Sequence, residues 1–236
     1  MGLSLILIVV LGLALLYIPK GELHLLLCAR HTPACDIFYR YYTQVAEWFP
    51  YVVCVALLLF SQIGDGVLAT SGLIFSALTT QFLKHLINAP RPVMWFAEHM
   101  PEVQLPLVES VRMNYWFSFP SGHTTSFFAL FFALSIILTT NDSETVLQRS
   151  GLGQTRKRSY STFACGLLQA ALWALAALGG YSRIYLSQHF AADVFAGMII
   201  GIGITLVCYA VLHRYEDKKW YNYRVFGPKK QENTKK

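Results

Sequence analysis

Long uninterrupted apolar runs dominate this chain and restrict it to folds that a lipid bilayer can surround. A membrane-spanning helix needs about 20 mostly apolar residues, and runs of this kind recur along the 236-residue sequence. Only 14% of the residues are charged and the mean hydropathy is +0.44, whereas a soluble domain carries about 25% charged residues. We therefore predict an all-α integral membrane protein.

A bundle of six transmembrane helices is expected from these runs. The predicted spans cover residues 3–18, 51–63, 67–83, 122–140, 163–180 and 190–212. The first follows no basic residues and precedes no small-residue cleavage site, so we interpret it as an uncleaved span rather than a signal peptide. Residues 20–48 mix Lys20, Arg30 and Arg40 with many aromatic residues. We predict that they form an interfacial helical segment along the membrane surface.

The distribution of basic residues predicts the orientation. Twelve of the 19 Lys and Arg residues lie between positions 141 and 162 or after position 213, and basic residues concentrate in cytoplasmic loops. Both termini are therefore expected in the cytoplasm, and the loops at 84–121 and 181–189 on the outer side. We expect residues 1–213 to form a single six-span domain and residues 214–236 a basic cytoplasmic tail.

Charge and cysteine content exclude some classes of function. The formal net charge of +6 does not indicate a nucleic acid partner, because basic residues also anchor membrane helices and no RNA-binding signature accompanies them. The five cysteines form no Cys-x-x-Cys pair, which argues against a zinc site. Cys28 and Cys35 flank a short polar segment and could form a disulfide in an oxidising compartment, a point that the sequence leaves open.

Three polar clusters stand at the ends of apolar helices, and all three fall on the predicted outer side. They comprise Lys84 to Pro92 with Arg91, then Pro120-Ser121-Gly122-His123, and then Ser182-Arg183 with His189 and Asp193. The predicted topology depends only on the apolar runs and on the basic loop and tail. The convergence of the clusters is therefore an independent indication of a site.

His189 and Asp193 are four residues apart and so share one face of a helix. A carboxylate there can accept a hydrogen bond from one ring nitrogen, which leaves the other nitrogen free to attack. Asp193 is also the only acidic residue within the six predicted spans, where an ionisable group is costly and marks a functional candidate. A buried packing contact is the structural alternative. A metal site is disfavoured because nearby cations would repel the ion and no second carboxylate cluster supports it.

The other two clusters supply groups that bind an anion. Ser121 and Gly122 open a predicted helix, whose N-terminus offers backbone N–H groups to a phosphate, although Ser121 can also serve as a helix cap. Lys84, Arg91 and Arg183 add three positive charges, although Lys84 could simply snorkel to the interface. Such a set favours phosphoryl transfer without a metal, in which one histidine attacks and another protonates the leaving oxygen.

In this order, the three clusters resemble the signature of the type 2 phosphatidic acid phosphatase superfamily. The matching patterns are Lys-x6-Arg-Pro from Lys84, Pro-Ser-Gly-His from Pro120 and Ser-Arg-x5-His-x3-Asp from Ser182, each without a substitution. The resemblance covers roughly residues 84–193, and the six-span layout extends it to most of the chain. Residues 20–48 and the tail match nothing specific.

The resemblance implies a role for each matched residue. His189 would be the nucleophile that forms a phosphohistidine, Asp193 would orient it, and His123 would protonate the departing alcohol. The phosphate would be held by Lys84, Arg91, Ser121, Gly122 and Arg183. The family needs no metal, so neither a metal nor another cofactor is expected.

We therefore predict a metal-independent phosphatase of membrane lipid phosphates, in a bacterial inner membrane with its site facing the periplasm. Phosphatidic acid, phosphatidylglycerol phosphate, undecaprenyl pyrophosphate and a lipid A phosphate all fit, and the small size of the chain favours the last two. One alternative is a phosphotransferase that passes the group to another lipid. The other is a non-catalytic membrane binder or transporter, against which the intact set His123, His189 and Asp193 argues.

Overall fold

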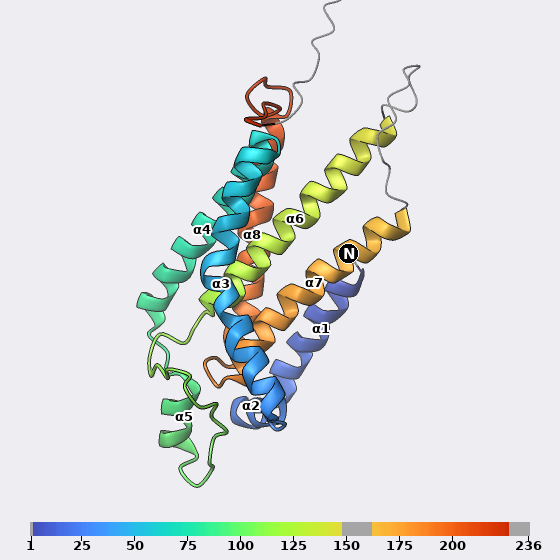
Figure 1. Cartoon of the computed structure of the whole chain (residues 1–236). Coiled ribbons are helices and arrows are strands. Elements are labelled where there is room, and N and C mark those ends of the chain that lie inside the picture. Colours follow the sequence, from blue (N-terminus) through green and yellow to red (C-terminus); the bar gives the residue numbers. More distant parts are fainter. Residues whose placement is uncertain (1, 148–161, 227–236) are drawn as a thin grey trace, which may run out of the picture.

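The computed structural model describes residues 2–147 and 162–226, in which every regular element is helical (Figure 1). The elements are α1 (Gly2–Tyr17), α2 (Lys20–Leu27), α3 (Pro33–Phe60), α4 (Ile63–Ile87), α5 (Pro92–His99), α6 (Gly122–Leu147), α7 (Thr162–Tyr185), α8 (Ala191–Leu212) and the 3-10 helix η2 (His213–Tyr215). Five candidate membrane spans within the described ranges fall on α3, α4, α6, α7 and α8. The prediction of an all-α membrane protein is confirmed.

The first predicted span forms a helix that is shorter than the helices of the other predicted spans. With 16 residues, α1 is about 24 Å long at 1.5 Å per residue, whereas the hydrocarbon core of a bilayer is about 30 Å thick. Side chains at Leu11, Leu15 and Ile18 pack on a buried cluster that includes Ile184 and Val194. The helix therefore lies against the ends of α7 and α8 that carry the third polar cluster.

The predicted interfacial segment is wrong for most of its length. Residues 33–48 belong to α3, a single helix of 28 residues that runs from Pro33 to Phe60. Thr43 and Ala46 are buried on its inner face, and Tyr42 donates a hydrogen bond to the Leu175 carbonyl on α7 (2.8 Å). The aromatic residues Phe38, Tyr41 and Trp48, which suggested a surface helix, are exposed on the outer face of this long helix instead.

Only α2 and the turn after it remain as a separate short segment before α3. Leu23 and His24 are buried, and the Tyr181 hydroxyl donates to the Leu27 carbonyl (2.8 Å), so α2 packs under α7. Cys28 is buried and Cys35 is partly exposed, and both are free thiols in the structure.

The turn between α3 and α4 is shorter than expected. Helix α4 already begins at Ile63, so Gly64 and Gly66 form its first turn rather than a loop. A Cβ on Gly66 would lie 2.7 Å from the Leu58 Cα, and one on Gly64 would lie 2.4 Å from the Tyr221 ring. Close approach of α3 and of the segment after η2 therefore explains both glycines.

Small residues allow α8 to pack closely on α6. A Cβ on Gly197 would lie 2.6 Å from the Ser121 carbonyl oxygen, and one on Gly201 would lie 2.6 Å from the Thr125 carbonyl oxygen. This Gly-x-x-x-Gly spacing is typical of helices that approach each other closely. Because Ser121 belongs to the second polar cluster, the same packing brings that cluster to α8.

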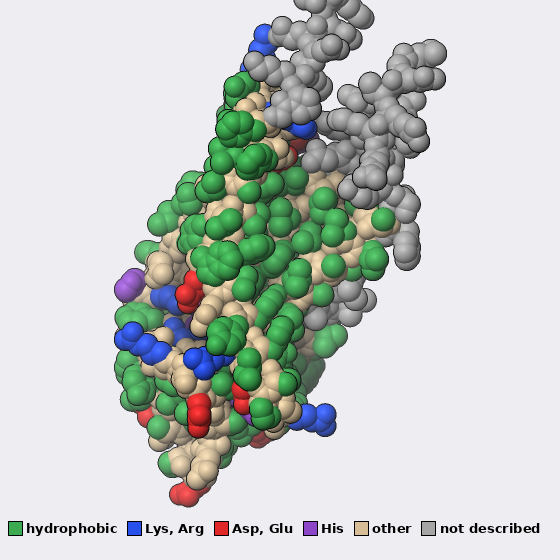
Figure 2. Space-filling view, in the orientation of Figure 1, with side chains coloured by type: hydrophobic (Ala, Val, Ile, Leu, Met, Phe, Trp, Pro, Cys, Tyr) green, Lys and Arg blue, Asp and Glu red, His purple; other side chains and the backbone are tan. Residues whose placement is uncertain are grey.

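The loops that carry the three polar clusters lie at one end of the bundle, together with α2 and α5 (Figure 1). Figure 2 shows hydrophobic side chains over much of the visible face of the long helices, with charged side chains gathered toward that end. Arg214, Lys218 and Lys219 follow α8 at the opposite end. The predicted orientation also relies on basic residues at 149–158 and 229–236, which lie outside the described residues.

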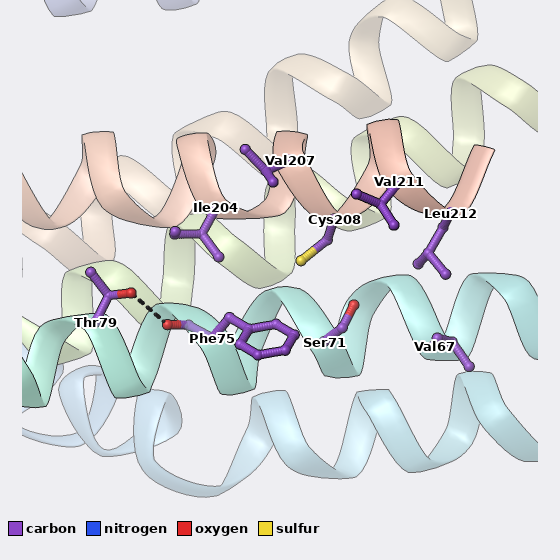
Figure 3. Close-up of a pocket in the computed structure, with 9 residues that line it drawn as sticks. All are labelled: Val67, Ser71, Phe75, Thr79, Ile204, Val207, Cys208, Val211 and Leu212. Atoms are coloured by element: carbon purple, nitrogen blue, oxygen red, sulfur yellow. Dashed lines mark hydrogen bonds between the residues drawn. The ribbon is translucent and has the colours of Figure 1, made fainter. Parts of the chain in front are cut away.

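A groove with a volume of about 440 Å³ lies between α4 and α8 (Figure 3). Its lining residues are Val67, Ser71, Phe75, Thr79, Ile204, Val207, Cys208, Val211 and Leu212. Because the Thr79 hydroxyl donates to the Phe75 carbonyl (2.9 Å), the groove presents a mostly apolar surface.

Candidate active site

The first polar cluster turns a corner between α4 and α5. The backbone N–H of Asn88 donates to the Lys84 carbonyl (2.9 Å), and Asn88 adopts a left-handed conformation (φ 44°) that ends α4, a position that asparagine tolerates. Pro92 then opens α5, where the missing N–H of proline costs no helical hydrogen bond. The segment between the third and fourth predicted spans therefore contains a short helix.

Arg91 is held at this corner by carbonyl groups from two other segments. Its Nε donates to the Trp116 carbonyl (2.9 Å), and its Nη1 donates to the Gln188 carbonyl (3.2 Å) and to Gln188 Oε1 (3.0 Å). The guanidinium is therefore fixed against the loop that carries His189.

The second polar cluster is fixed by the first turn of α8. The backbone N–H of Ser121 donates to the Asp193 carbonyl (3.0 Å), and the Ser121 hydroxyl accepts from the Thr124 hydroxyl (2.8 Å). A Cβ on Gly122 would lie 3.9 Å from Lys84 Nζ. The N-terminus of α6 and the Lys84 ammonium thus come together, as the anion-site prediction requires.

The third polar cluster folds back on the end of α7. The backbone N–H groups of Gln188 and His189 both donate to the Arg183 carbonyl (3.0 and 3.1 Å), and Ser187 takes a positive φ of 50° in this turn. Arg183 and His189 are brought to the same place by this compact loop.

His189, Asp193 and Ser118 form a buried polar group. The imidazole Nδ1 lies 3.6 Å from Asp193 Oδ2 and 3.5 Å from the Ser118 hydroxyl. Asp193 Oδ2 also accepts from the Ser118 hydroxyl (2.5 Å) and from the Phe190 N–H (2.9 Å). Since His189 and Asp193 are only 1% and 4% exposed, this group constrains the ring orientation. Ser118 was not predicted, and no motif in the sequence marks it.

Burial and three nearby cations determine the protonation of His189. Burial is the largest influence, followed by the charges of Arg91, Arg183 and Lys84, and together they hold the pKa of His189 well below its ordinary value. The ring is therefore neutral at physiological pH, which is the form that can act as a nucleophile.

Arg183 is a buried cation with unused hydrogen-bonding capacity. Its Nη1 donates to the Thr43 hydroxyl on α3 (2.6 Å), whereas its Nε is buried and makes no hydrogen bond within the described residues. A buried guanidinium of this kind suits bidentate contact with phosphate oxygens. Thr43 is a second contributor that the sequence did not reveal.

His123 is the predicted catalytic residue that comes closest to the surface. Its side chain is 27% exposed and its Nε2 lies 3.3 Å from Glu47 Oε1 on α3. It interacts electrostatically with His189 and with the three cations, so all the predicted site residues converge. Glu47 was not predicted, although its spacing of four residues from Thr43 places both on one helix face.

Helix α2 supports the loop that carries His189. His24 is fully buried, and its Nε2 lies 3.3 Å from the Ser187 hydroxyl. Burial lowers the pKa of His24 to about 4, against the opposing charge of Asp193. No three His, Cys, Asp or Glu side chains in the described part of the chain group closely enough to hold a metal ion.

A comparison with protein families decides the classification of this arrangement. The model of the PAP2 superfamily matches residues 65–217, more than half of the chain. The chain belongs to the PAP2 superfamily. This finding confirms the predicted family and extends the match beyond the three motifs to both ends of the α4–α8 region.

The curated relatives that the chain matches are distant. Lipid phosphate phosphatase 2 of Arabidopsis thaliana is 30% identical over 175 residues, with 67% of this chain and 55% of the relative covered. Dolichyldiphosphatase 1 of Dictyostelium discoideum is 30% identical over 158 residues, covering 67% and 57%. Lipid A 4'-phosphatase of Porphyromonas gingivalis is 25% identical over 202 residues, covering 80% and 70%. The chain thus spans little more than half the length of the first two.

Two crystal structures share the fold. LpxE of Aquifex aeolicus superposes with a TM-score of 0.56 at 23% identity, covering 80% of this chain and 93% of that one. A transmembrane PAP2-type phosphatidylglycerolphosphate phosphatase of Bacillus subtilis gives a TM-score of 0.60 at 16% identity, covering 91% and 96%. At these identities the two structures support the fold alone.

Proposed function

We propose that this PAP2 protein is a metal-independent phosphatase of membrane lipids that works through a phosphohistidine. The observation that carries the proposal is the buried group of Ser118, His189 and Asp193 beside three cations. Because Nδ1 of His189 faces Asp193, its Nε2 is the nitrogen available to attack phosphorus. Lys84, Arg91, Arg183 and the α6 N-terminus at Ser121 and Gly122 would hold the phosphate oxygens and stabilise their charge.

The reaction has two steps in this proposal. His189 Nε2 bonds to phosphorus as the bond from phosphorus to the lipid oxygen breaks, and His123 gives a proton to that oxygen. Water then attacks the phosphohistidine, His123 takes a proton from it, and phosphate leaves. Asp193 keeps the attacking ring in one tautomer throughout.

The substrate is proposed to be an envelope lipid that carries a phosphomonoester or pyrophosphate. The relatives are named for lipid phosphates, dolichyl diphosphate and lipid A, which supports this class without selecting a member. We favour a lipid A phosphate or undecaprenyl pyrophosphate over phosphatidylglycerol phosphate and phosphatidic acid. A head group at the interface would meet the site while its tails stay among the long apolar helices (Figure 2).

We further propose six spans, with α1 as the first, both termini in the cytoplasm and the site facing the periplasm of a bacterial inner membrane. The basic residues that follow α8 support this orientation because they lie at the end opposite the site. Residues 1–213 would form the catalytic domain and residues 214–236 the tail.

The test is phosphate release in detergent with excess chelator, from each of the four candidate lipids. His189→Ala is expected to lower release by at least about 10³-fold because the nucleophile is lost. His85→Ala, an exposed histidine at the same end, should keep near-wild-type activity. A wild type that is inactive on every lipid, or an active His189→Ala variant, would contradict the proposal. Release only when an acceptor lipid is added would favour the phosphotransferase.

A further inference from the structure

Glu47 is a charged residue of α3 whose exposed neighbours on the helix are apolar. Its side chain is 64% exposed, and the neighbouring Trp48, Tyr51 and Val52 are exposed apolar residues. An ionisable group in a spanning helix is costly and marks a functional candidate. Glu47 also lies outside residues 65–217, the part of the chain that matches the family.

The direction of the Glu47 side chain is set by its helix. Thr43, one turn earlier on the same helix, accepts a hydrogen bond from Arg183 Nη1 (2.6 Å). Glu47 Oε1 then lies 3.3 Å from His123 Nε2. Two successive turns of α3 therefore contact two different residues of the proposed pocket. This arrangement argues against an accidental ion pair on the surface.

His123 needs a negative partner if it is to act as an acid. A general acid must carry the proton that it transfers, and protonated imidazole is a cation. His123 shares the pocket with Lys84, Arg91 and Arg183, and with His189. A carboxylate at hydrogen-bonding distance balances the added charge and determines which ring nitrogen faces the substrate.

We propose that Glu47 is a positioning residue that holds the Nε2–H of His123, so that Nδ1–H protonates the leaving oxygen. This inference rests on the proposed phosphatase function. In the first step the bond from His189 Nε2 to phosphorus forms, the bond from phosphorus to the lipid oxygen breaks, and the Nδ1 proton moves to that oxygen. Glu47 keeps its charge throughout and exchanges no proton with the substrate.

The test compares two substrates whose leaving oxygens differ in their need for a proton. The alkoxide of dioctanoyl phosphatidic acid is a poor leaving group that needs one, whereas the phenolate of p-nitrophenyl phosphate does not. Glu47→Gln should lower kcat/KM for the lipid by roughly 10- to 100-fold, a part of the ~10²–10⁴-fold effect of general acid catalysis. The value for the aryl phosphate should change less than about threefold. A loss of folding or of phosphate binding would lower both.

A double variant asks whether Glu47 acts through His123. If it does, Glu47→Gln should add nothing to His123→Gln on the lipid substrate, because the effects of residues that act as a unit are not additive. Glu98→Gln, an exposed carboxylate on α5 at the same end of the bundle, is the matched control. It should stay within about twofold of wild type on both substrates.

The outcomes separate this inference from the function on which it rests. Equal losses on both substrates, no loss on either, or additive effects with His123→Gln would overturn the role of Glu47 while His189-dependent activity persisted. A wild type that releases phosphate from neither substrate, nor from any of the other candidate lipids, would overturn the proposed function and this inference together.

Discussion

The proposed pocket has two walls that are built differently. Helices α4, α6, α7 and α8 form one wall, whose parts are joined by backbone hydrogen bonds such as Ser121 N–H to the Asp193 carbonyl. Helices α2 and α3 form the other wall and reach the site through the side chains of His24, Thr43 and Glu47. The first wall carries the family motifs, whereas the second lies before residue 65, where the family match begins.

This difference separates two tasks. The first wall presents groups that any phosphoryl transfer of this kind requires, and backbone contacts fix them regardless of most side-chain changes. The second wall contacts those groups only through its side chains, so single side chains there can change without loss of the fold. We therefore expect α2 and α3 to tune the site that the four motif-bearing helices define.

The largest expected contrast lies across the Arg183–Thr43 contact, which joins the two walls. Arg183→Gln removes a buried cation and should lower kcat/KM by about 10²–10³-fold, as loss of a group that stabilises transition-state charge does. Thr43→Val removes only the contact that holds the guanidinium. It should lower kcat/KM by about tenfold, the lower end of the roughly 1.5–3 kcal/mol that hydrogen bonds to charged groups contribute. Steady-state kinetics on the preferred lipid measures both. If both variants lost the same kcat/KM, the contact from α3 would be as important for catalysis as the Arg183 charge itself.

His24 offers a pH test of how firmly α2 supports the loop. Its folded pKa of about 4 lies below the ordinary 6.5, so the folded state resists protonation. Stability is fully present above pH 6.5 and falls as the pH drops toward 4, by roughly 3 kcal/mol for a shift of this size. Unfolding midpoints from pH 8 to pH 4 should fall less steeply in His24→Gln than in wild type.

Another histidine variant serves as the control for that slope. His85→Gln replaces an exposed histidine at the end of α4 and should follow the wild-type curve. If His24→Gln also follows the wild-type curve, α2 contributes no pH-dependent support to the loop.

The sequence predicts the residues of the first wall better than those of the second. The starts of α6, α7 and α8 follow from the apolar runs, whereas α4 begins at Ile63, four residues before its predicted span. The three motifs predict the convergence of their side chains. Thr43 and Glu47 could not be found this way. The polar residues of a long spanning helix, buried at Thr43 and exposed at Glu47, look the same in a sequence as those of an interfacial helix. Ser118 lies in a loop without periodicity, where only the three-dimensional contact to Asp193 reveals it.

Packing within the first wall can be tested with two glycines of α8. A Cβ on Gly201 would lie 2.6 Å from the Thr125 carbonyl oxygen and 2.9 Å from the Ala129 nitrogen, both backbone atoms. Gly201→Ala should therefore destabilise the protein by about 1–3 kcal/mol, the typical cost of overpacking. Gly203 has no atom within 4 Å of its Cβ position, so Gly203→Ala should be neutral or stabilise by up to about 1 kcal/mol. Thermal unfolding in detergent distinguishes them.

The smallest expected effect concerns the groove between α4 and α8 (Figure 3). It follows α4 from Val67 to Thr79, about 18 Å at 1.5 Å per residue, a length that fits part of a substrate hydrocarbon chain in the proposed lipid phosphatase. Ile204→Trp would narrow it and should lower kcat/KM for long-chain lipids by about fourfold, equivalent to the burial of one methylene at about 0.8 kcal/mol. Substrates with chains too short to enter should be unaffected. Ile199→Trp, at an exposed apolar position of α8 outside the groove, is the control. If both variants discriminate equally against long chains, the added bulk on the lipid-facing surface, rather than the groove, would account for the effect.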